Sequence, residues 1–187
     1  MNNLKSHIQS ITRFSEESWD ILSHCLVEKE FKKNEFLLKE DQICSSIFFI
    51  CSGLCKSYFN RDGKEINTAF YFENTFATNI KSLRTTSKSA YSIKACVKTR
   101  VIEIDKTRLL QAYTQTHQIE TFGRKMLELI MTQQEEHADG FKLLTPRERF
   151  DGLVAKHPDL LQKVPLTQLA SYLGISRETL SRFRARK

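Results

Sequence analysis

Residues 166–185 read LTQLASYLGISRETLSRFRA, and this stretch decides the fold that we expect for the C-terminal part of the chain. Apolar residues three and four positions apart predict two short helices, with Gly174 providing a tight turn between them. Thr167 and Ser176 are suited to cap the first and second helix, and Ala170 is the small residue that two steeply crossing helices need where they touch. The inward-facing apolar residues are Leu169, Leu173, Ile175, Leu180 and Phe183. The stretch therefore predicts a helix-turn-helix.

The outward face of the second helix carries side chains that can read base edges in a DNA major groove. Arginine matches the paired acceptors of guanine, and glutamate accepts a hydrogen bond from cytosine. The candidate base-reading residues are Arg177, Glu178, Ser181 and Arg182. The candidate phosphate contacts are Thr167, Ser176, Arg184, Arg186 and Lys187. The alternative interpretation is a solvated basic tail, but the internal helix pattern favours DNA binding.

Composition indicates a globular protein with a basic balance. The 187 residues carry a formal net charge of +7, and 40% of them are hydrophobic. A basic chain is compatible with a nucleic-acid partner but does not identify one. The N-terminus lacks the apolar core of a signal peptide, and no apolar run approaches the roughly 20 residues that cross a bilayer. We therefore expect a cytoplasmic protein without a membrane partner, whose five cysteines form no secreted disulfide framework.

The N-terminal part predicts helices followed by a β domain. The first thirty residues have helical spacing, and Ser15 can cap a helix that has two acids in its first turn. Residues 31–105 contain short runs rich in Phe, Ile, Val, Tyr and Thr, separated by turn signals. The clearest turn is Asp62-Gly63, which predicts a hairpin. We expect an α+β chain with an antiparallel β-barrel, or double-stranded β-helix, and flanking helices.

A longer helix is expected at residues 113–137. Its apolar residues alternate at spacings of three and four, as in the seam of a helix pair. They are Ile119, Phe122, Met126 and Leu129. Two interpretations stay open on these residues alone: the helix packs on its own barrel, or it forms a dimer interface.

Beyond this helix the sequence predicts a hinge and a second small domain. Gly140 is the candidate hinge, and Thr145-Pro146 with Glu148 has the pattern of a helix start. We therefore divide the chain into the β-barrel with its flanking helices at 1–112, the long helix at 113–137 and a DNA-binding domain at 138–187. The short segment before the helix-turn-helix leaves room for a reduced wing only, in an otherwise winged-helix-like domain.

The chain resembles the Crp/Fnr family of bacterial transcription regulators along nearly its whole length. SRETLSR at 176–182 is similar to the recognition-helix signature of that family, in which two arginines and the glutamate contact bases. IFFICSGLCKSYFNRDGKE at 47–65 resembles the sensor barrel of the family. The resemblance implies a homodimer formed through the long helix, with two recognition helices one DNA turn apart. The implied partners are double-stranded DNA, a second copy, RNA polymerase and a small-molecule effector.

The region that would bind a cyclic nucleotide departs from the family pattern. Cyclic-nucleotide-binding members have a Gly-Glu pair and a later Arg followed by Ser or Thr. Here no Gly precedes Glu73, and Lys88 with Ser89 stands near the place of the arginine. A lysine lacks the bidentate fork that pairs with a phosphate. Glu73, Lys88 and Ser89 are the candidate effector residues, with ordinary surface charge as the favoured alternative. We expect no standard cAMP site and no cofactor, and the effector is unknown.

Other classes of protein fit the sequence less well. An iron–sulfur sensor of the Fnr kind needs an N-terminal cysteine cluster that this chain lacks, and nothing supports haem at His24 or His117. A cupin-type metal enzyme needs several histidines in the barrel, but none lies between those two. No catalytic or metal residues are expected, so we predict no enzyme. A protein-docking module with a helix-turn-helix that no longer binds DNA is the remaining alternative.

Overall fold

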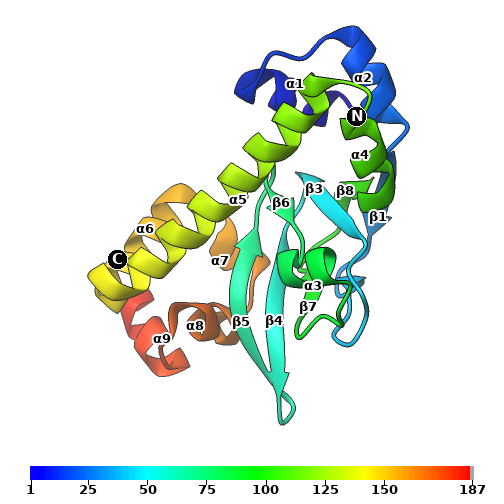
Figure 1. Ribbon diagram of the computed structural model, residues 1–187. Coiled ribbons are helices and arrows are strands. Elements are labelled where there is room, and N and C mark those ends of the chain that lie inside the picture. The colour runs from blue at the N-terminus through cyan, green and yellow to red at the C-terminus, as the bar shows by residue number, and fades with distance from the viewer. Residues whose placement is uncertain (186–187) are drawn as a thin grey trace.

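The computed structural model describes residues 1–185 and has α+β architecture (Figure 1). The helices are α1 (Asn2–Ile11), α2 (Glu16–Ser23), α3 (Ile80–Thr85), α4 (Lys106–Tyr113), α5 (His117–Leu143), α6 (Pro146–Lys156), α7 (Leu160–Lys163), α8 (Leu166–Leu173) and α9 (Arg177–Ala185). The strands are β1 (Leu26–Phe31), β2 (Phe36–Leu38), β3 (Ser46–Ser52), β4 (Cys55–Arg61), β5 (Lys64–Tyr71), β6 (Phe76–Ala77), β7 (Ser92–Ala95) and β8 (Thr99–Asp105). This order confirms the predicted fold class.

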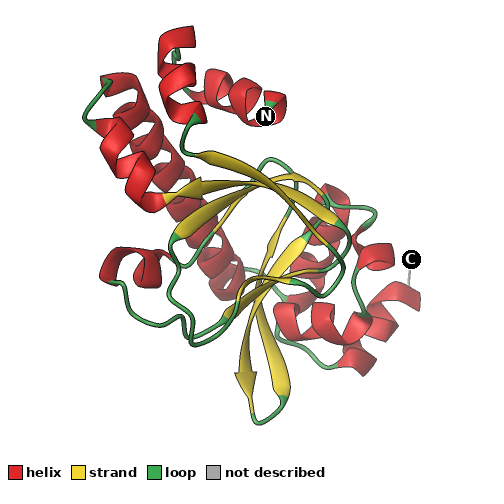
Figure 2. Cartoon of the chain, turned by 90° about the vertical axis from the view of Figure 1, so that its right-hand side faces the viewer, coloured by secondary structure: helices red, strands yellow, loops and turns green. Residues whose placement is uncertain are grey.

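Two four-stranded antiparallel sheets form the barrel (Figure 2). Their strand orders are β1-β8-β3-β6 and β2-β7-β4-β5. The predicted hairpin joins β4 to β5, and both of its turn residues, Asp62 and Gly63, have positive φ, as a tight two-residue hairpin turn requires. The hairpin puts β5 at the edge of its sheet.

Helices α1, α2, α4 and α5 cover one end of the barrel and share its core. Leu4, Leu22, Phe49 and Phe122 are all fully buried in this cluster. The predicted cap of α2 is confirmed, since the Ser15 hydroxyl accepts a hydrogen bond from the Ser18 N–H. The N-terminal helices are therefore part of the barrel domain rather than a separate arm.

The long helix α5 differs from the prediction in its extent. It begins at His117 and runs without interruption through Gly140 to Leu143, and the chain becomes extended at Leu144. The prediction of a hinge at Gly140 was therefore wrong. A glycine lowers helix propensity by only about 1 kcal/mol, which the flanking turns of a 27-residue helix outweigh here.

Three of the four residues predicted for the dimer interface lie in the core of their own chain. Ile119, Phe122 and Met126 are at most 1% exposed and pack against the barrel, and Leu129 is half-buried. The assignment of Ile119, Phe122 and Met126 to a dimer interface is corrected, because a side chain covered by its own barrel has no surface left for a second copy. The alternating spacing came from the barrel-facing side of α5.

The C-terminal helices begin as the sequence predicts. Thr145 and Glu148 form a reciprocal capping box, and Pro146 occupies the first turn of α6. Between α6 and α8 the chain forms the short helix α7. Within residues 1–185 no strand follows β8, so the described C-terminal helices carry no hairpin wing.

Helix α8 packs directly on the barrel, beside β5 (Figure 1). The Ser171 hydroxyl accepts a hydrogen bond from the Asn67 N–H at 3.0 Å and donates one to the Glu65 carbonyl at 3.2 Å. One hydrophobic cluster joins barrel residues to the C-terminal helices. Its barrel members are Leu54, Phe70 and Cys96, and it continues through Phe150, Leu169 and Leu180.

Candidate nucleic-acid interface

The turn between α8 and α9 has the geometry that its sequence predicts. Gly174 ends α8 in the left-handed conformation, with φ 69° and ψ 33°. The Ile175 N–H donates to the Ala170 carbonyl at 3.0 Å, which satisfies the end of α8. A side chain at Gly174 would approach the Phe141 ring at 3.1 Å, so the position also suits glycine for its closeness to α5.

One predicted cap is wrong and the other is confirmed. Helix α8 begins at Leu166 after Pro165, so Thr167 lies inside its first turn and does not cap it. Pro165 occupies the N-cap position, and no side-chain capping hydrogen bond is made there. At the start of α9, the Ser176 hydroxyl accepts the Thr179 N–H at 3.1 Å, as predicted.

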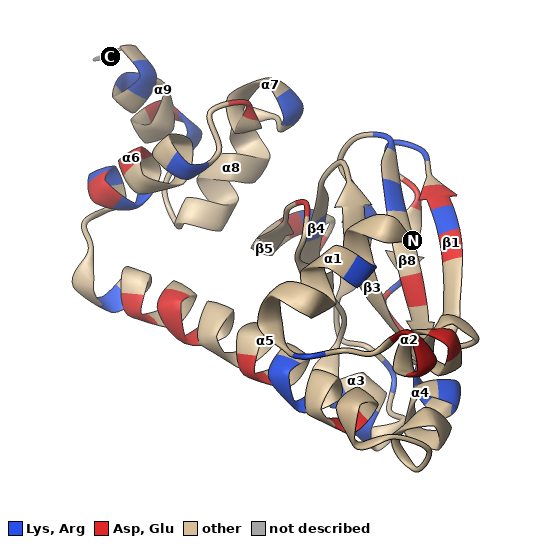
Figure 3. Cartoon of the chain, turned by 90° about the horizontal axis from the view of Figure 1, so that it is seen from above, with Lys and Arg blue, Asp and Glu red and all other residues tan. Residues whose placement is uncertain are grey.

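The predicted base-reading residues lie together on the solvent side of α9. Arg177, Glu178, Ser181 and Arg182 are all exposed. The opposite side of the helix is held by Leu180, which is fully buried. Figure 3 shows basic positions along α9 at the end of the molecule far from β1.

Three of the five predicted phosphate contacts lie within the described residues. Thr167, Ser176 and Arg184 are exposed. Arg186 and Lys187 lie outside the described residues. The solvent side of α9 and the start of α8 therefore both expose hydroxyl groups, and α9 also exposes a guanidinium group.

The charged groups of α9 are held by short local contacts. Hydrogen bonds from its own backbone N–H and from Ser176 lower the pKa of Glu178, so its carboxylate is an acceptor at neutral pH. The Arg182 guanidinium donates to the Thr179 hydroxyl at 3.2 Å. This contact is within one helical turn and leaves the other guanidinium donors of Arg182 free to meet a paired acceptor.

Sequence reasoning missed one residue that fixes α9 in place. Arg147 on α6 donates to Asp151 at 2.7 Å and to the carbonyl of Phe183 at 3.2 Å, and its guanidinium lies 5.4 Å from the Phe183 ring. Arg147 and Asp151 are one helical turn apart, which is a sequence signal for an ion pair. The contact with α9 has no such signal, because it joins residues 36 positions apart.

The predicted effector residues are engaged in local structure. Glu73 is exposed in the turn after β5 and accepts the N–H of Gly53 at 3.1 Å. Ser89 is buried, accepts from Asn79 at 2.8 Å and donates to the Tyr91 carbonyl at 2.6 Å. Lys88 is exposed on the neighbouring loop. The hydroxyl of Ser89 thus holds the loop after α3 together.

The cysteines are free and are held mostly in apolar surroundings. Burial raises the pKa of Cys55 to about 12 and that of Cys96 to about 11. These thiols stay protonated at neutral pH and are weak nucleophiles and metal ligands. Among the described residues, no group of three or more His, Cys, Asp or Glu side chains is arranged to hold a metal ion.

Part of the chain matches a known family of domains. Residues 28–116, just under half of the chain, match the family described as cyclic nucleotide-binding domain. The match ends at the residue before α5 begins. Comparison with curated proteins gives no match. No helix within residues 1–185 combines the length and the apolar character needed to span a membrane.

Several solved structures share the fold of most of the chain. FixK2 from Bradyrhizobium japonicum has a TM-score of 0.72 at 20% identity, with 86% of this chain and 83% of FixK2 covered. A protein from Eubacterium rectale assigned to the Crp/Fnr transcriptional regulators has a TM-score of 0.69 at 14% identity, with 92% and 83% covered. The c-di-GMP-responsive regulator CLP from Xanthomonas campestris has a TM-score of 0.63 at 15% identity, with 92% and 91% covered. This chain therefore shares its fold with these proteins over most of its length.

Proposed function

We propose that this chain, which contains a cyclic nucleotide-binding-type domain and has a Crp/Fnr-like fold, is a homodimeric transcription regulator that binds specific DNA sites through α9. One observation carries the proposal. Arg177, Glu178, Ser181 and Arg182 all lie on the exposed side of a helix whose other side is anchored by Leu180. A helix presented in this way fits a major groove. The proposed regulator is cytoplasmic and not an enzyme, and RNA polymerase is its further protein partner.

The proposed dimer uses a different side of α5 from the one that covers the barrel. Leu127 and Met131 are 41% and 70% exposed, and Ala138 lies two turns further along the same side. Arg124 and Glu128 form an ion pair beside this stripe at 2.5 Å. Apolar residues four and seven positions apart with flanking charges are typical of a helix pair. We therefore assign the dimer contact to Leu127, Met131 and Ala138.

The proposed DNA contacts are tested in two steps with the full chain. Selection from a random DNA pool first identifies the preferred site. Arg182→Ala should then weaken binding to that site by about 1–3 kcal/mol, with relaxed base preference at one position, because a guanidinium pairs with one base. Arg184→Ala is the matched control. It should weaken binding to every DNA sequence by the same amount, because Arg184 is proposed to contact phosphate.

Two results would contradict this assignment. An equal loss for Arg182→Ala on specific and unrelated DNA would place Arg182 on phosphate. Failure of the intact chain to enrich any sequence would favour a docking module that does not bind DNA.

A further inference from the structure

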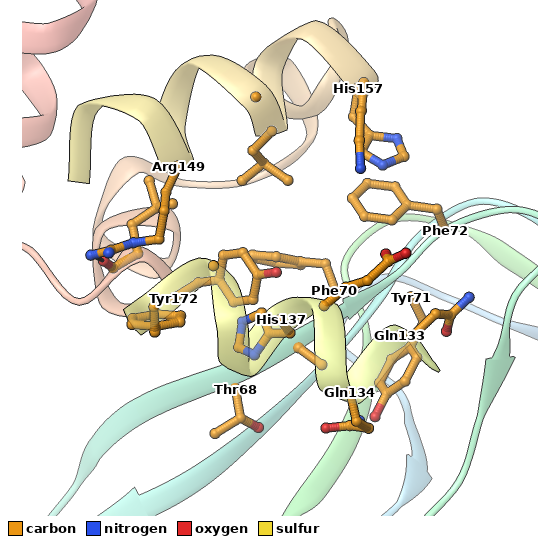
Figure 4. Close-up of a pocket in the computed structure, with 18 of the residues that line it drawn as sticks. Thr68, Phe70, Tyr71, Phe72, Gln133, Gln134, His137, Arg149, His157 and Tyr172 are labelled. Atoms are coloured by element: carbon orange, nitrogen blue, oxygen red, sulfur yellow. Dashed lines mark hydrogen bonds between the residues drawn. The ribbon is translucent and has the colours of Figure 1, made fainter. Parts of the chain in front are cut away.

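A cavity of about 540 Å³ lies at the junction of the barrel and the C-terminal helices (Figure 4). Residues of β5, α5, α6 and α8 line this junction cavity, and in the described part of the chain none comes from α9. Small-molecule sites in proteins have volumes of roughly 300–1,000 Å³ and are mostly apolar with a few placed polar groups. The junction cavity is separate from the proposed DNA-reading face and can be occupied while α9 is free.

Flat rings make up much of its wall. Tyr172 meets Phe70 edge-on with ring centroids 4.9 Å apart and stacks on His137 at 5.1 Å with an interplanar angle of 27°. Phe72 and His157 lie parallel on the same cavity. Figure 4 shows these rings converging from the barrel and from the helices. Aromatic walls of this kind favour a planar ligand, which can stack on one ring and meet the edge of another.

Two unpartnered nitrogen atoms belong to side chains that line this cavity. Arg149 donates to the carbonyls of Leu144 at 2.7 Å and Leu173 at 3.0 Å, which leaves its Nε without a partner. The Nε2 atom of His137 is also buried without a partner. Burial lowers the pKa of His137, and the charge of Arg149 adds to this effect, so the two groups are electrostatically coupled. Buried polar groups without partners are uncommon and call for an explanation.

The acidic residues on the cavity wall leave this positive charge uncompensated. Glu73 is occupied by the N–H of Gly53, and Glu148 by the N-cap of α6. Glu136 is exposed to solvent. Arginine with a neighbouring nitrogen donor is a good partner for a carboxylate.

We propose that the junction cavity binds a small planar aromatic carboxylate, with its ring against Tyr172 and Phe70 and its carboxylate toward Arg149 and His137. The ligand would contact both the barrel and the helix-turn-helix, and would therefore favour the arrangement in which α8 is docked on β5. This last consequence rests on the proposed function; the binding itself does not.

Titration calorimetry on the full chain at neutral pH, without DNA, tests the proposal. Indole-3-carboxylate is the probe, and indole-3-carboxamide is its neutral counterpart of the same shape. We expect saturable binding of the acid and about tenfold weaker binding of the amide, because a charge-assisted hydrogen bond is replaced by a neutral one. The pKa of His137, followed by its ring resonances, should rise when the acid binds.

A filled cavity provides the control for location. Gly152 lines the cavity, and a Cβ atom there would meet nothing within 4 Å, so Gly152→Leu should fold and block the site. Ala155→Leu is the matched control, since Ala155 is exposed on the same helix and does not line the cavity. We expect Gly152→Leu to abolish binding and Ala155→Leu to retain it.

Three results would overturn the proposal: no saturable heat with the acid, equal binding of acid and amide, or binding that survives Gly152→Leu. None of these measurements involves DNA. A failure of DNA recognition would therefore leave this result intact, and absence of the ligand site would leave the DNA result intact.

Discussion

Gly123 shows how one residue fixes the packing of two helices. It lies inside α5, where glycine is unfavourable, and a Cβ atom at this position would come within 1.9 Å of the Tyr113 hydroxyl. The glycine therefore lets α4 and α5 approach each other over the barrel core. Gly140 in the same helix has nothing within 4 Å of such an atom.

These two glycines predict opposite effects of the same substitution. Gly123→Ala should destabilise the protein, because overpacking costs about 1–3 kcal/mol and outweighs the gain in helix propensity. Gly140→Ala should stabilise it by about 0.5–1 kcal/mol, because only the propensity changes. Urea unfolding of both variants measures the difference. In a Tyr113→Ala background, Gly123→Ala should become stabilising; a persistent loss would mean that another contact is responsible.

At the scale of elements, α5 has two sides with different tasks. One side buries Ile119, Phe122 and Met126 in the barrel core. Another leaves Leu127 and Met131 exposed. Exposed apolar residues in a row on one helix side are characteristic of a contact with a partner.

The second side of α5 predicts how the proposed dimer can be broken. Met131→Glu should give a monomer, because it puts a charge in the centre of the proposed apolar contact. Thr132→Glu adds the same charge on an exposed neighbouring position and should leave the dimer intact. Light scattering during size-exclusion chromatography reports the mass of each variant. A wild-type monomer at every concentration, or a dimeric Met131→Glu, would refute the proposed interface.

Sequence patterns predicted the helices and their caps better than the contacts between distant elements. The turn at Gly174, the cap at Ser176 and the capping box at Thr145 depend on residues close in the chain, so the sequence alone was sufficient. The spacing of Ile119 and Phe122 identified a buried helix side but not what covers it, because a barrel and a second copy demand the same apolar stripe. The docking of α8 on β5 joins residues more than 100 positions apart and leaves no local pattern.

At the scale of the whole molecule, three histidines lie where different parts of the fold pack together. His137 and His157 lie at the junction cavity, and the ring of His7, on α1, packs against the rings of Phe49 and Phe76. Burial lowers the pKa of all three. For His157, Asp159 opposes this shift, whereas Lys156 and Lys163 add to it.

These shifts predict that acid weakens the folded state. The unfolded chain binds protons at the ordinary histidine pKa of about 6.5, whereas the folded chain binds them only at lower pH. Stability is therefore fully present above that value and falls as the pH drops below it. His137→Phe keeps an aromatic ring without titration and should reduce the loss between pH 8 and pH 5.5, measured by urea unfolding at each pH. An unchanged pH dependence would show that His137 does not titrate differently on folding.

The hydrogen bonds of Ser171 to β5 also bear on aggregation. An edge strand with unpaired backbone groups is a template on which another chain can add a strand, and natural proteins cover such edges. Helix α8 covers the edge of β5. It also covers the apolar side chains of Leu54, Phe70 and Cys96. In the proposed regulator, a movement of α8 away from the barrel toward DNA would expose both the unpaired edge of β5 and this apolar patch. For the proposed regulator, the risk of aggregation therefore limits how far, and for how long, α8 and α9 can leave the barrel.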